Sequence, residues 1–343
     1  MQQHPPPPRE DLLTEPDPVK KIGNHVLHRV LGADAAAILK KMHDLTGTPK
    51  FPGPNPISLE KKDLQKLRQK QYYACDKTDG VRHAFFACTS KGHNVAVVVD
   101  RRLTVWLLPL RGLPRAAFQG TVLDGEIALN TRNSSEPEAA RWQFLTFDAV
   151  WVSGVPAFAL RFMERIAAAR KMVGACVQAT DDVLALRVKN FVDMAAGPES
   201  VDALRAHLDM AAGFFACDGI VFTPDDQVAY GRHMDMFKFK DSAKHTVDFL
   251  VLDAAGGLGV WDPSSKNHAS VGRVAKVNNA RMPPRGAVVE CSLRCARSKT
   301  WTVVMQRLDK NEANDMLTFQ KTLVNIRENL SFDDHVAPLF TAL

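Results

Sequence analysis

The sequence has no apolar run approaching the roughly 20 residues that a membrane-spanning helix needs, and its first 18 residues lack the apolar core of a signal peptide. Those residues hold four consecutive prolines and scattered charges instead, which predicts that residues 1–20 are disordered. These absences argue against a membrane protein and against a secreted protein. We therefore expect no membrane partner and a location inside a cell.

Cysteine patterns that indicate a metal site or a disulfide framework are also missing. The chain has six cysteines, with no C-x-x-C pair and no histidine at zinc-site spacing. We expect reduced thiols packed in buried strands. The six are Cys75, Cys88, Cys176, Cys217, Cys291 and Cys295.

Charge of neither sign is in large excess. The chain has 44 Lys and Arg against 38 Asp and Glu, which gives a formal net charge of +6 and a pI near 9.0. That balance permits a polyanionic partner such as nucleic acid without requiring one. With 343 residues, of which 45% are hydrophobic, the chain can form about two domains with full cores.

The order of apolar and polar residues predicts an α+β fold. Alternating apolar residues and turn signals predict strands between residues 71 and 150, including a hairpin across residues 100–102. Helical spacing of apolar residues predicts helices near residues 35–45, 160–173 and 200–212.

We place the domain boundary near residue 241. Residues 21–241 are expected to form a first domain of antiparallel sheets with flanking helices, in which FPGPNPISL (51–59) is a loop without regular structure. After it, five short strands joined by Gly, Pro and Asn turns favour a small barrel of the OB kind over residues 242–330. Residues 331–343 would be a tail that packs back on the first domain.

The stretch CDKTDGVR places Lys77 just ahead of Asp79 and Gly80, with Arg82 close behind, between two predicted strands. Taken alone, it fits a surface turn with an incidental lysine as well as it fits a functional site. We expect Asp79 and Gly80 to reverse the chain and so to present Lys77 to a groove.

Other charged residues near the ends of predicted strands could meet in that groove. The carboxylates of Glu126, Asp148 and Asp218 could hold Mg²⁺ or bind a ribose. Five cations could hold phosphates, namely Lys77, Arg82, Arg101, Lys238 and Lys240. Such a set has the parts for attack by a lysine on a nucleotide α-phosphate, with pyrophosphate as the leaving group.

Six stretches of the chain occur in a recognisable order. They are KTDGVR (77–82), LDGEI (123–127), FLTFDAV (144–150), DGIVF (218–222), FKFK (237–240) and RLDK (307–310). In that order they resemble the motifs of the covalent nucleotidyltransferases, which include mRNA capping enzymes and ATP- or NAD-dependent ligases. Three more stretches resemble the mRNA guanylyltransferases of the chlorella-virus type: FPGPNPISL, DRRLTVWLLP (100–109) and WTVVMQRLDKNEAND (301–315).

The resemblance implies a ligase-like nucleotidyltransferase fold and a role for each matched residue. Lys77 would be the nucleophile that takes GMP from GTP as a Lys–GMP phosphoramidate. Thr78 and Lys189 would contact the guanine edge, and Phe147 would stack on the base.

The remaining matched residues would hold the sugar, the metal and the phosphates. Arg82 and Glu126 would bind the ribose, while Asp218 would support the metal or the reacting lysine. Glu126 and Asp218 are the candidate ligands of Mg²⁺ or Mn²⁺. Phosphates would be held by Arg101, Lys238 and Lys240. Once the barrel closes over the groove, the triphosphate would also meet Arg307, Asp309 and Lys310, which would orient pyrophosphate as the leaving group.

The resemblance further implies a second step, in which 5′-diphosphate RNA takes GMP from Lys77 and becomes GpppRNA. We expect a monomer that works with a separate RNA triphosphatase and a separate cap methyltransferase, because the chain has no room for those domains. A viral protein of this type would act in the nucleus or cytoplasm of the infected host cell, or in the virion.

Two other functions stay open at the level of sequence. An ATP-dependent polynucleotide ligase would share the lysine chemistry but use ATP. A non-catalytic RNA-binding protein with an OB fold would be expected to have lost the lysine or its carboxylates, and all of them are present.

Overall fold

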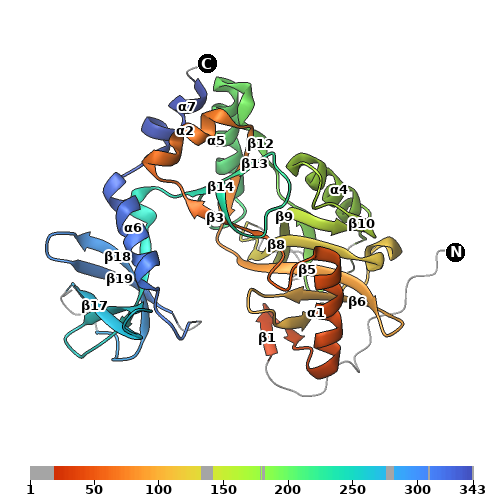
Figure 1. The fold of residues 1–343 in the computed structure, drawn as a ribbon, viewed down its shortest axis with the longest axis horizontal. Coiled ribbons are helices and arrows are strands. Elements are labelled where there is room, and N and C mark those ends of the chain that lie inside the picture. The colour runs from red at the N-terminus through yellow and green to blue at the C-terminus, as the bar shows by residue number, and fades with distance from the viewer. Residues whose placement is uncertain are drawn as a thin grey trace. The chain divides into compact units, whose positions relative to one another are not determined.

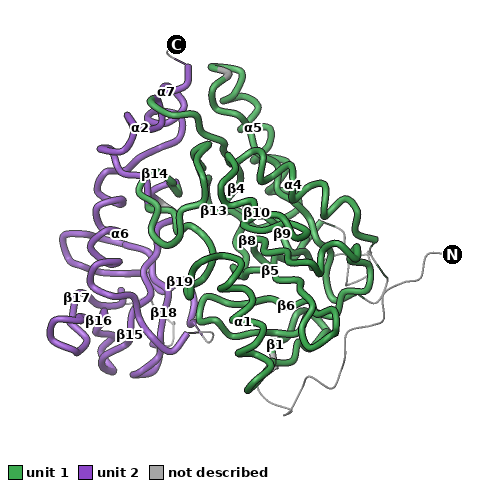
Figure 2. The backbone as a smooth tube through the Cα atoms, turned by 45° about the vertical axis from the view of Figure 1, so that its right-hand side comes forward, with its two compact units in different colours: residues 1–57, 69–238, 343 green, residues 58–68, 239–342 purple. Residues whose placement is uncertain are grey.

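The computed structural model describes residues 19–132, 142–177, 179, 182–275, 282–307 and 310–341. The chain divides into two compact units, coloured separately in Figure 2: unit 1 comprises residues 1–57, 69–238 and 343, and unit 2 comprises residues 58–68 and 239–342. The segment 58–68, which we expected in the first domain, groups with unit 2. The functional division near residue 241 stays a prediction.

The larger sheet of unit 1 has seven strands in the order β10-β9-β8-β5-β6-β7, with β11 paired to β9 in parallel (Figure 1). The bounds are β5 (Val81–Ser90), β6 (His93–Val99), β7 (Val105–Leu107), β8 (Thr121–Leu129), β9 (Trp142–Val152), β10 (Val155–Pro156) and β11 (Ala185–Val188). The pairing of β6 with β7 confirms the predicted hairpin across residues 100–102. A two-stranded ribbon of β1 (Val19–Ile22) and β2 (His25–His28) precedes this sheet in the chain.

Both faces of the seven-stranded sheet are buried. On β5, Phe86 belongs to a core cluster that includes Met42 of α1 (Gly32–Thr46), while Phe85 belongs to a second cluster that includes Met172 of α4 (Phe162–Gly174). Consecutive strand residues point to opposite faces. A helix therefore covers each face, which holds the sheet rigid where it carries the site.

The smaller sheet of unit 1 has five strands in the order β12-β4-β13-β14-β3. The bounds are β3 (Pro54–Ser58), β4 (Tyr72–Thr78), β12 (Val192–Asp193), β13 (Cys217–Pro224) and β14 (Gly231–Phe239). The prediction of a loop over residues 51–59 was wrong for its second half, since that half forms β3. Proline is tolerated there because β3 is an edge strand, where alternate backbone groups need no ladder partner. Helix α5 (Pro198–Ala212) packs against β4.

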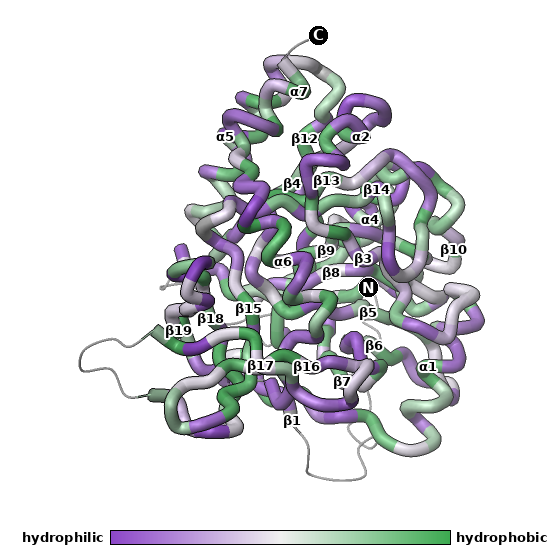
Figure 3. The backbone as a smooth tube through the Cα atoms, turned by 60° about the vertical axis from the view of Figure 1, so that its left-hand side comes forward, coloured by the Kyte–Doolittle hydropathy of each residue, from purple (hydrophilic) through white to green (hydrophobic). Residues whose placement is uncertain are grey.

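Unit 2 contains a closed five-stranded barrel in the order β15-β16-β17-β19-β18, in which only β17 and β19 pair in parallel. The bounds are β15 (Thr246–Val251), β16 (Gly257–Asp262), β17 (Asn267–Val274), β18 (Val288–Cys295) and β19 (Thr300–Gln306). In Figure 3 the barrel strands carry both hydrophobic and hydrophilic stretches. Phe249 lies 4.8 Å from Trp301 and 5.9 Å from Phe319 of α6 (Met316–Glu328), measured between ring centroids, so the helix closes the barrel core.

The rest of unit 2 consists of short helices. Helix α2 (Leu64–Gln69) lies in the segment 58–68, except for its last residue. Helix α7 (Pro338–Thr341) is the last described element. Residues 331–341 group with unit 2, where the ring centroids of Phe332 and Phe239 are 6.4 Å apart. Phe239 falls within the predicted first domain of residues 21–241, and the packing of the tail on that domain stays a prediction. No helix in the described ranges is both long and apolar enough to span a bilayer.

The cysteines are all free thiols, as predicted. Cys75, Cys88 and Cys291 are buried on strands. Cys176 and Cys217 are half-buried, while Cys295 is exposed at the end of β18, against the expectation that all six would be buried.

Candidate active site

Lys77 lies near the end of β4, beside the adjacent strand β13. The ladder between these strands pairs Gly219 with Lys77 and Cys217 with Thr78, so Asp218 occupies a β-bulge. A bulge turns a side chain out of the regular alternation. Here the bulged carboxylate of Asp218 accepts a hydrogen bond from Lys77 Nζ at 2.7 Å, while both side chains stay about one quarter exposed, at 24% and 25%. The amine is therefore held in one place and remains reachable from solvent.

The Asp79-Gly80 pair does not form the turn that was predicted. Strand β4 belongs to the five-stranded sheet and β5 to the seven-stranded sheet, so the pair carries the chain from one sheet to the other. A Cβ on Gly80 would lie 2.9 Å from Glu126 Cγ, closer than real Cβ atoms come. Glycine at this position thus leaves room for Glu126 immediately after the strand of Lys77.

Lys189, which follows β11, is the buried centre of a polar cluster. Its Nζ donates to Thr78 Oγ1 at 2.7 Å and pairs with Glu126 Oε1 at 2.8 Å and with Asp76 Oδ2 at 3.1 Å. Burial acts to lower the pKa of Lys189, but the charges of Glu126, Cys75 and Asp76 outweigh it and raise the pKa. The structure therefore brings Thr78 and Lys189 together around a permanent positive charge.

Asp76, the residue before Lys77, holds this cluster from the other side. Its carboxylate accepts a hydrogen bond from Thr78 Oγ1 at 2.5 Å and contacts Nε2 of His207, on α5, at 3.1 Å. Burial acts to raise the pKa of Asp76, but the hydrogen bond to His207 and the charge of Lys189 outweigh it and lower the pKa. Asp76 is an anion that fixes the positions of Lys189 and Thr78.

Arg82 is bound on three sides at the start of β5. Its Nε and Nη2 reach the two carboxylate oxygens of Asp124 at 2.9 and 2.5 Å. Its Nη1 donates to Asn55 Oδ1 at 2.9 Å, and Nη2 also donates to the Pro54 carbonyl at 2.7 Å. A bidentate pair with this many partners has little freedom to rotate.

Two aromatic rings complete the surroundings of Arg82. Its guanidinium carbon lies 5.0 Å from the ring centre of Phe51 and 5.4 Å from that of Phe147. Both rings are half-buried, so part of each remains accessible. The structure thus joins Phe147, predicted to stack on a base, with Arg82, predicted to bind a ribose.

The buried carboxylate of Asp124 makes the free energy of unfolding depend on pH. Burial raises the pKa of Asp124 to about 6, although the charge of Arg82 acts in the opposite direction. The folded chain therefore holds a proton at pH values where an unfolded aspartate, with a pKa of 3.8, has released it. We expect the contribution of this group to the free energy of unfolding to fall as the pH rises from 3.8 to about 6.

Asp124→Asn should remove that contribution, because the amide does not titrate. The measurement is a series of urea unfolding curves across that pH range for both proteins. If the free energies of unfolding of the wild type and the variant change in parallel throughout, the raised pKa of Asp124 is contradicted.

The remaining cations predicted for unit 1 are more dispersed. Arg101 is exposed in the turn between β6 and β7. Lys238 is half-buried on β14, the strand next to that of Asp218. Lys240 follows directly after β14 and is also half-buried. Their contacts with phosphates stay predictions.

The predicted cations of the barrel meet at one carboxylate. Arg307 Nη1 lies 3.2 Å from Asp248 Oδ1 and 3.4 Å from Glu290 Oε2, and Lys310 Nζ also pairs with Asp248. Asp248 is only 6% exposed. Asp309, predicted to act with these cations, lies outside the described residues.

The predicted metal ligands differ in how well they suit a metal ion. Within the described ranges, no three His, Cys, Asp or Glu residues gather as a metal-binding group. Mg²⁺ is often held by one or two carboxylates together with substrate phosphates, and the partly exposed Asp218 fits that mode. Glu126 is 9% exposed and paired with Lys189, so it fits less well. Asp148, also considered, forms a buried ion pair with Arg165 at 2.7 Å and is only 2% exposed.

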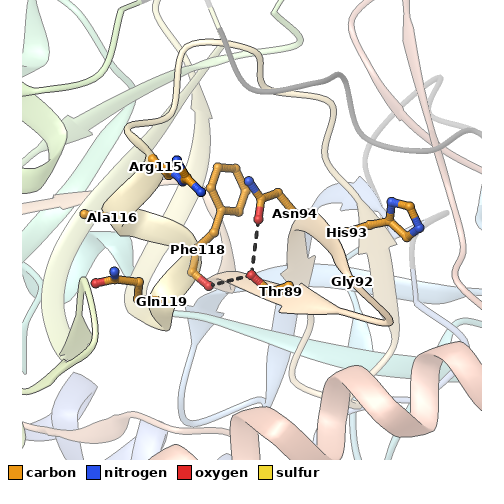
Figure 4. Close-up of a pocket in the computed structure, with 8 residues that line it drawn as sticks. All are labelled: Thr89, Gly92, His93, Asn94, Arg115, Ala116, Phe118 and Gln119. Carbon is orange, nitrogen blue, oxygen red and sulfur yellow. Dashed lines mark hydrogen bonds between the residues drawn. The ribbon is translucent and has the colours of Figure 1, made fainter. Parts of the chain in front are cut away.

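A cavity of about 520 Å³ in unit 1 lies apart from this site (Figure 4). Its wall includes Thr89, near the end of β5, whose hydroxyl donates to Asn94 Oδ1 at 3.2 Å and to the Phe118 carbonyl at 3.4 Å. Thr89 is seven residues along β5 from Arg82, or roughly 23 Å at the rise of an extended strand. The cavity therefore takes no part in the Lys77 site.

Several residues of the site were not predicted. Asp76 and Asp124 lie inside two of the quoted stretches, CDKTDGVR and LDGEI, and carboxylates so close in sequence to the matched residues were the signal that could have identified them. His207 and Asp248 carried no such signal, because each meets its partner only through the tertiary fold.

Solved structures with detectable similarity include a mycobacterial DNA ligase D complexed with ATP and MES, at 14% identity and a TM-score of 0.41, over 75% of this chain and 94% of that chain. Another is the ligase domain of M. tuberculosis LigD, at 16% identity and a TM-score of 0.32, over 70% of this chain and 90% of that chain. TM-scores this low carry no conclusion about fold or function.

Curated relatives are named as capping enzymes. The chain is 33% identical over 110 residues to the mRNA-capping enzyme subunit alpha of Neurospora crassa, covering 29% of this chain and 26% of that protein. It is 25% identical to the mRNA-capping enzyme of Danio rerio over 77% of this chain, a match that spans 45% of the fish protein. It is 22% identical to the mRNA-capping enzyme subunit alpha of Schizosaccharomyces pombe, over 88% of this chain and 83% of that protein. The matched region thus spans less than half of the first two relatives.

Family models match residues of both units. The model for the catalytic domain of mRNA capping enzymes matches residues 24–242, which include the Lys77 cluster. The model for the C-terminal domain of the same enzymes matches residues 234–335, which include Arg307 and Lys310. The chain therefore belongs to the mRNA capping enzyme family.

Proposed function

We propose that this chain is an mRNA 5′-capping guanylyltransferase, which moves GMP from GTP to the 5′-diphosphate end of RNA through a covalent Lys77–GMP intermediate. The observation that carries the proposal is the placement of Lys77. Its amine is partly exposed and fixed by Asp218 at 2.7 Å, on the strand that also supplies Thr78 to the buried cluster of Lys189. Membership of the capping enzyme family supports the same reaction.

The first step forms a P–N bond. The free amine of Lys77 attacks the α-phosphorus of GTP, the bond from that phosphorus to the bridging oxygen breaks, and pyrophosphate leaves. The ammonium must lose its proton first, and Asp218 is the adjacent acceptor. In the second step a terminal phosphate oxygen of 5′-diphosphate RNA attacks the same phosphorus, the P–N bond breaks, and Lys77 regains a proton. The products are GpppRNA and the free enzyme.

Selection of GTP over ATP is assigned to Lys189 and Thr78. Guanine presents an acceptor oxygen at its O6 position, where adenine presents an amino donor. The Lys189 ammonium is a permanent donor, so it would bind guanine and repel the adenine amino group. Phe147 supplies a half-buried ring for stacking on the base.

The other charged residues would bind the sugar and the phosphates of GTP. Arg82 and Glu126 would hydrogen-bond the ribose, and Arg101, Lys238 and Lys240 would hold the triphosphate. Asp218, with the phosphates of the substrate, would hold Mg²⁺ or Mn²⁺. When bound, that ion would neutralise negative charge on the phosphates.

We assign the barrel of unit 2 to the OB fold, because its five strands close with a single parallel pair between β17 and β19. Arg307 and Lys310 would assist the release of pyrophosphate. To do so they must exchange their bonds to Asp248 for bonds to phosphate oxygens. Asp248 would therefore set how readily these cations become available.

The proposed reaction requires one enzyme that supplies its RNA substrate and another that consumes its product. Its substrate, a 5′-diphosphate RNA, would be produced by a separate RNA triphosphatase, and its product would be consumed by a cap methyltransferase. The names of two fungal relatives, as subunit alpha, support such a division between proteins. The chlorella-virus type and the monomeric state stay predictions.

The proposal is tested by a chase of labelled enzyme. Protein loaded with α-labelled GTP is freed of nucleotide and mixed with 5′-diphosphate or 5′-monophosphate RNA. We expect the label to appear as GpppRNA with the diphosphate acceptor alone. Transfer to the monophosphate end, followed by sealing to a 3′-hydroxyl, would indicate a ligase instead.

His207 is expected to position the guanine-binding residues without touching the nucleotide. His207→Ala would remove one partner of Asp76 and lower the free energy of unfolding by about 1–3 kcal/mol. Because Lys189 and Thr78 would be held less firmly, the KM for GTP should rise several-fold while the kcat of Lys77 labelling changes little. His207→Gln, which keeps a hydrogen-bonding group, should restore most of the affinity. An equal KM for GTP in His207→Ala and the wild type would contradict this role.

A further inference from the structure

Charge in the barrel is distributed unevenly along the chain. The whole chain has 44 Lys and Arg against 38 Asp and Glu, but residues 263–307 contain nine Lys and Arg against one acidic residue, Glu290. Glu290 is already bound to Arg307 at 3.4 Å. This part of the barrel therefore carries a strong positive charge with almost no internal compensation.

Three of these cations lie at the turn between β18 and β19, namely Arg294 near the end of β18 and Arg297 and Lys299 in the turn itself, and all three are exposed. Within the described ranges no carboxylate lies within ion-pair distance of them. The turn has a defined shape, since Lys299 N donates to the Ala296 carbonyl at 3.3 Å and Ser298 Oγ contacts Thr300 Oγ1 at 3.0 Å. We call these three cations the turn cations.

A fourth cation extends the turn cations along the barrel. Arg273, at the end of β17, is exposed, and its backbone N–H donates to the Lys299 carbonyl at 3.1 Å. The close approach of these strands depends on Gly272, where a Cβ would lie 2.6 Å from that same carbonyl. The ends of β17, β18 and β19 thus present four neighbouring positive charges.

The other lysine-rich part of the chain, residues 61–70, is different. Lys62 pairs with Glu60, Lys66 lies 3.9 Å from Asp63, and Lys70 binds Asp235 at 2.7 Å. Local carboxylates therefore neutralise much of its charge. A polyanion gains most from cations that have no such partner, because no existing ion pair must be broken.

We propose that the turn cations, with Arg273, bind the phosphate backbone of the RNA downstream of its 5′ end. This inference rests on the proposed function, which requires an RNA substrate. A turn of exposed cations on a small barrel suits single-stranded RNA because backbone phosphates recur along the strand and are bound without regard to sequence. The surface would give affinity for RNA and would leave the chemistry at Lys77 unchanged.

The experiment compares wild-type protein with a triple variant, Arg294→Gln, Arg297→Gln and Lys299→Gln. A matched control, Lys62→Gln, Lys66→Gln and Arg68→Gln, removes the same charge from the same unit. Each protein is assayed for labelling by GTP, for transfer of GMP to a 5′-diphosphate dinucleotide and to a 5′-diphosphate RNA of about 20 nucleotides, and for binding of that RNA by fluorescence anisotropy at several salt concentrations.

The turn variant should label with GTP and use the dinucleotide as the wild type does, but bind the long RNA more weakly. Three lost phosphate contacts lower the slope of log affinity against log salt by about 2. Raising the salt from about 50 to about 200 mM should therefore weaken binding by the wild type about 20-fold more than binding by the variant. The control variant should keep the wild-type slope.

Two results would overturn the inference. One is a turn variant that binds the long RNA with the affinity and salt slope of the wild type. The other is a control variant that loses as much affinity as the turn variant, which would indicate a general effect of net charge. Absence of GMP labelling in the wild type would instead count against the proposed function, and the anisotropy measurement would still decide whether the turn binds RNA.

Discussion

Replacing Lys77 by alanine is expected to abolish covalent labelling of the protein by α-labelled GTP. Lys189, the other lysine of the cluster around Thr78, cannot replace it, because Lys189 is 7% exposed and bound to Thr78, Glu126 and Asp76. The fold should survive, since the Lys77–Asp218 pair is partly exposed and such pairs contribute about 1 kcal/mol or less. The measurement is a denaturing gel of protein incubated with labelled GTP and Mg²⁺, alongside a thermal unfolding curve.

Two further variants make the result for Lys77 interpretable. Lys77→Arg keeps the positive charge beside Asp218 but lacks the primary amine, so it should also fail to label. Lys40→Ala removes an exposed lysine that pairs with Asp44 on the surface of α1, and it should label as the wild type does. Label that persists in folded Lys77→Ala would mean that another residue is the nucleophile and that the assignment of the site is wrong.

Replacing Gly53 by alanine is expected to cause a large loss of stability for the addition of a single methyl group. The new Cβ would lie 2.0 Å from Asp124 Oδ2 and 2.6 Å from Arg82 Nη2, so the buried ion pair between them could not keep its geometry. Disrupting a buried pair of this kind costs about 3–5 kcal/mol. Because Arg82 is assigned to the ribose, labelling by GTP should fall with stability. Urea unfolding at neutral pH measures the first effect, and labelling at limiting GTP measures the second.

A second glycine provides the control for this prediction. Gly174, the last residue of α4, has no atom within 4 Å of the position that a Cβ would occupy. Gly174→Ala should therefore change the free energy of unfolding by less than about 1 kcal/mol. Equal stability of Gly53→Ala and Gly174→Ala would show that the Arg82–Asp124 pair tolerates displacement, which would contradict the prediction for Gly53.

Local features of the site could be predicted from the sequence, since each depends on residues a few positions apart. Lys77, Thr78 and Arg82 belong to one stretch, and the strands that carry Glu126 and Asp218 follow from apolar alternation beside an Asp-Gly pair. The structure describes all five on β4, β5, β8 and β13 or directly beside them.

Features that depend on distant partners could not be predicted in this way. The Asp79-Gly80 pair fits a hairpin by composition, but β4 finds its partner in β13, which is about 140 residues further along the chain. Pro54 and Pro56 indicated a loop, although an edge position allows both in β3. His207 meets Asp76 across 131 positions, and no local pattern marks such a contact. Tertiary packing determines these partners, and the periodicity of the sequence does not reveal them.

In the barrel, too, local features were predictable from the sequence and contacts between distant residues were not. Short strands and turns were sufficient to predict a small barrel after residue 241, and the structure contains a closed one. The role of Asp248 in holding Arg307 and Lys310 was not predictable, because the three residues come from two ends of the barrel sequence. Only the closure of β15 against β18 brings them together.

The proposed function depends above all on whether this chain forms a covalent lysine adduct with GMP and not with AMP. The most direct experiment incubates the protein with α-labelled GTP and with α-labelled ATP, in parallel and with Mg²⁺, and resolves both reactions on a denaturing gel. We predict a labelled band from GTP alone, lost in Lys77→Ala and chased by 5′-diphosphate RNA into GpppRNA. A labelled band from ATP alone would contradict the proposed function and would assign the chain the activity of a polynucleotide ligase.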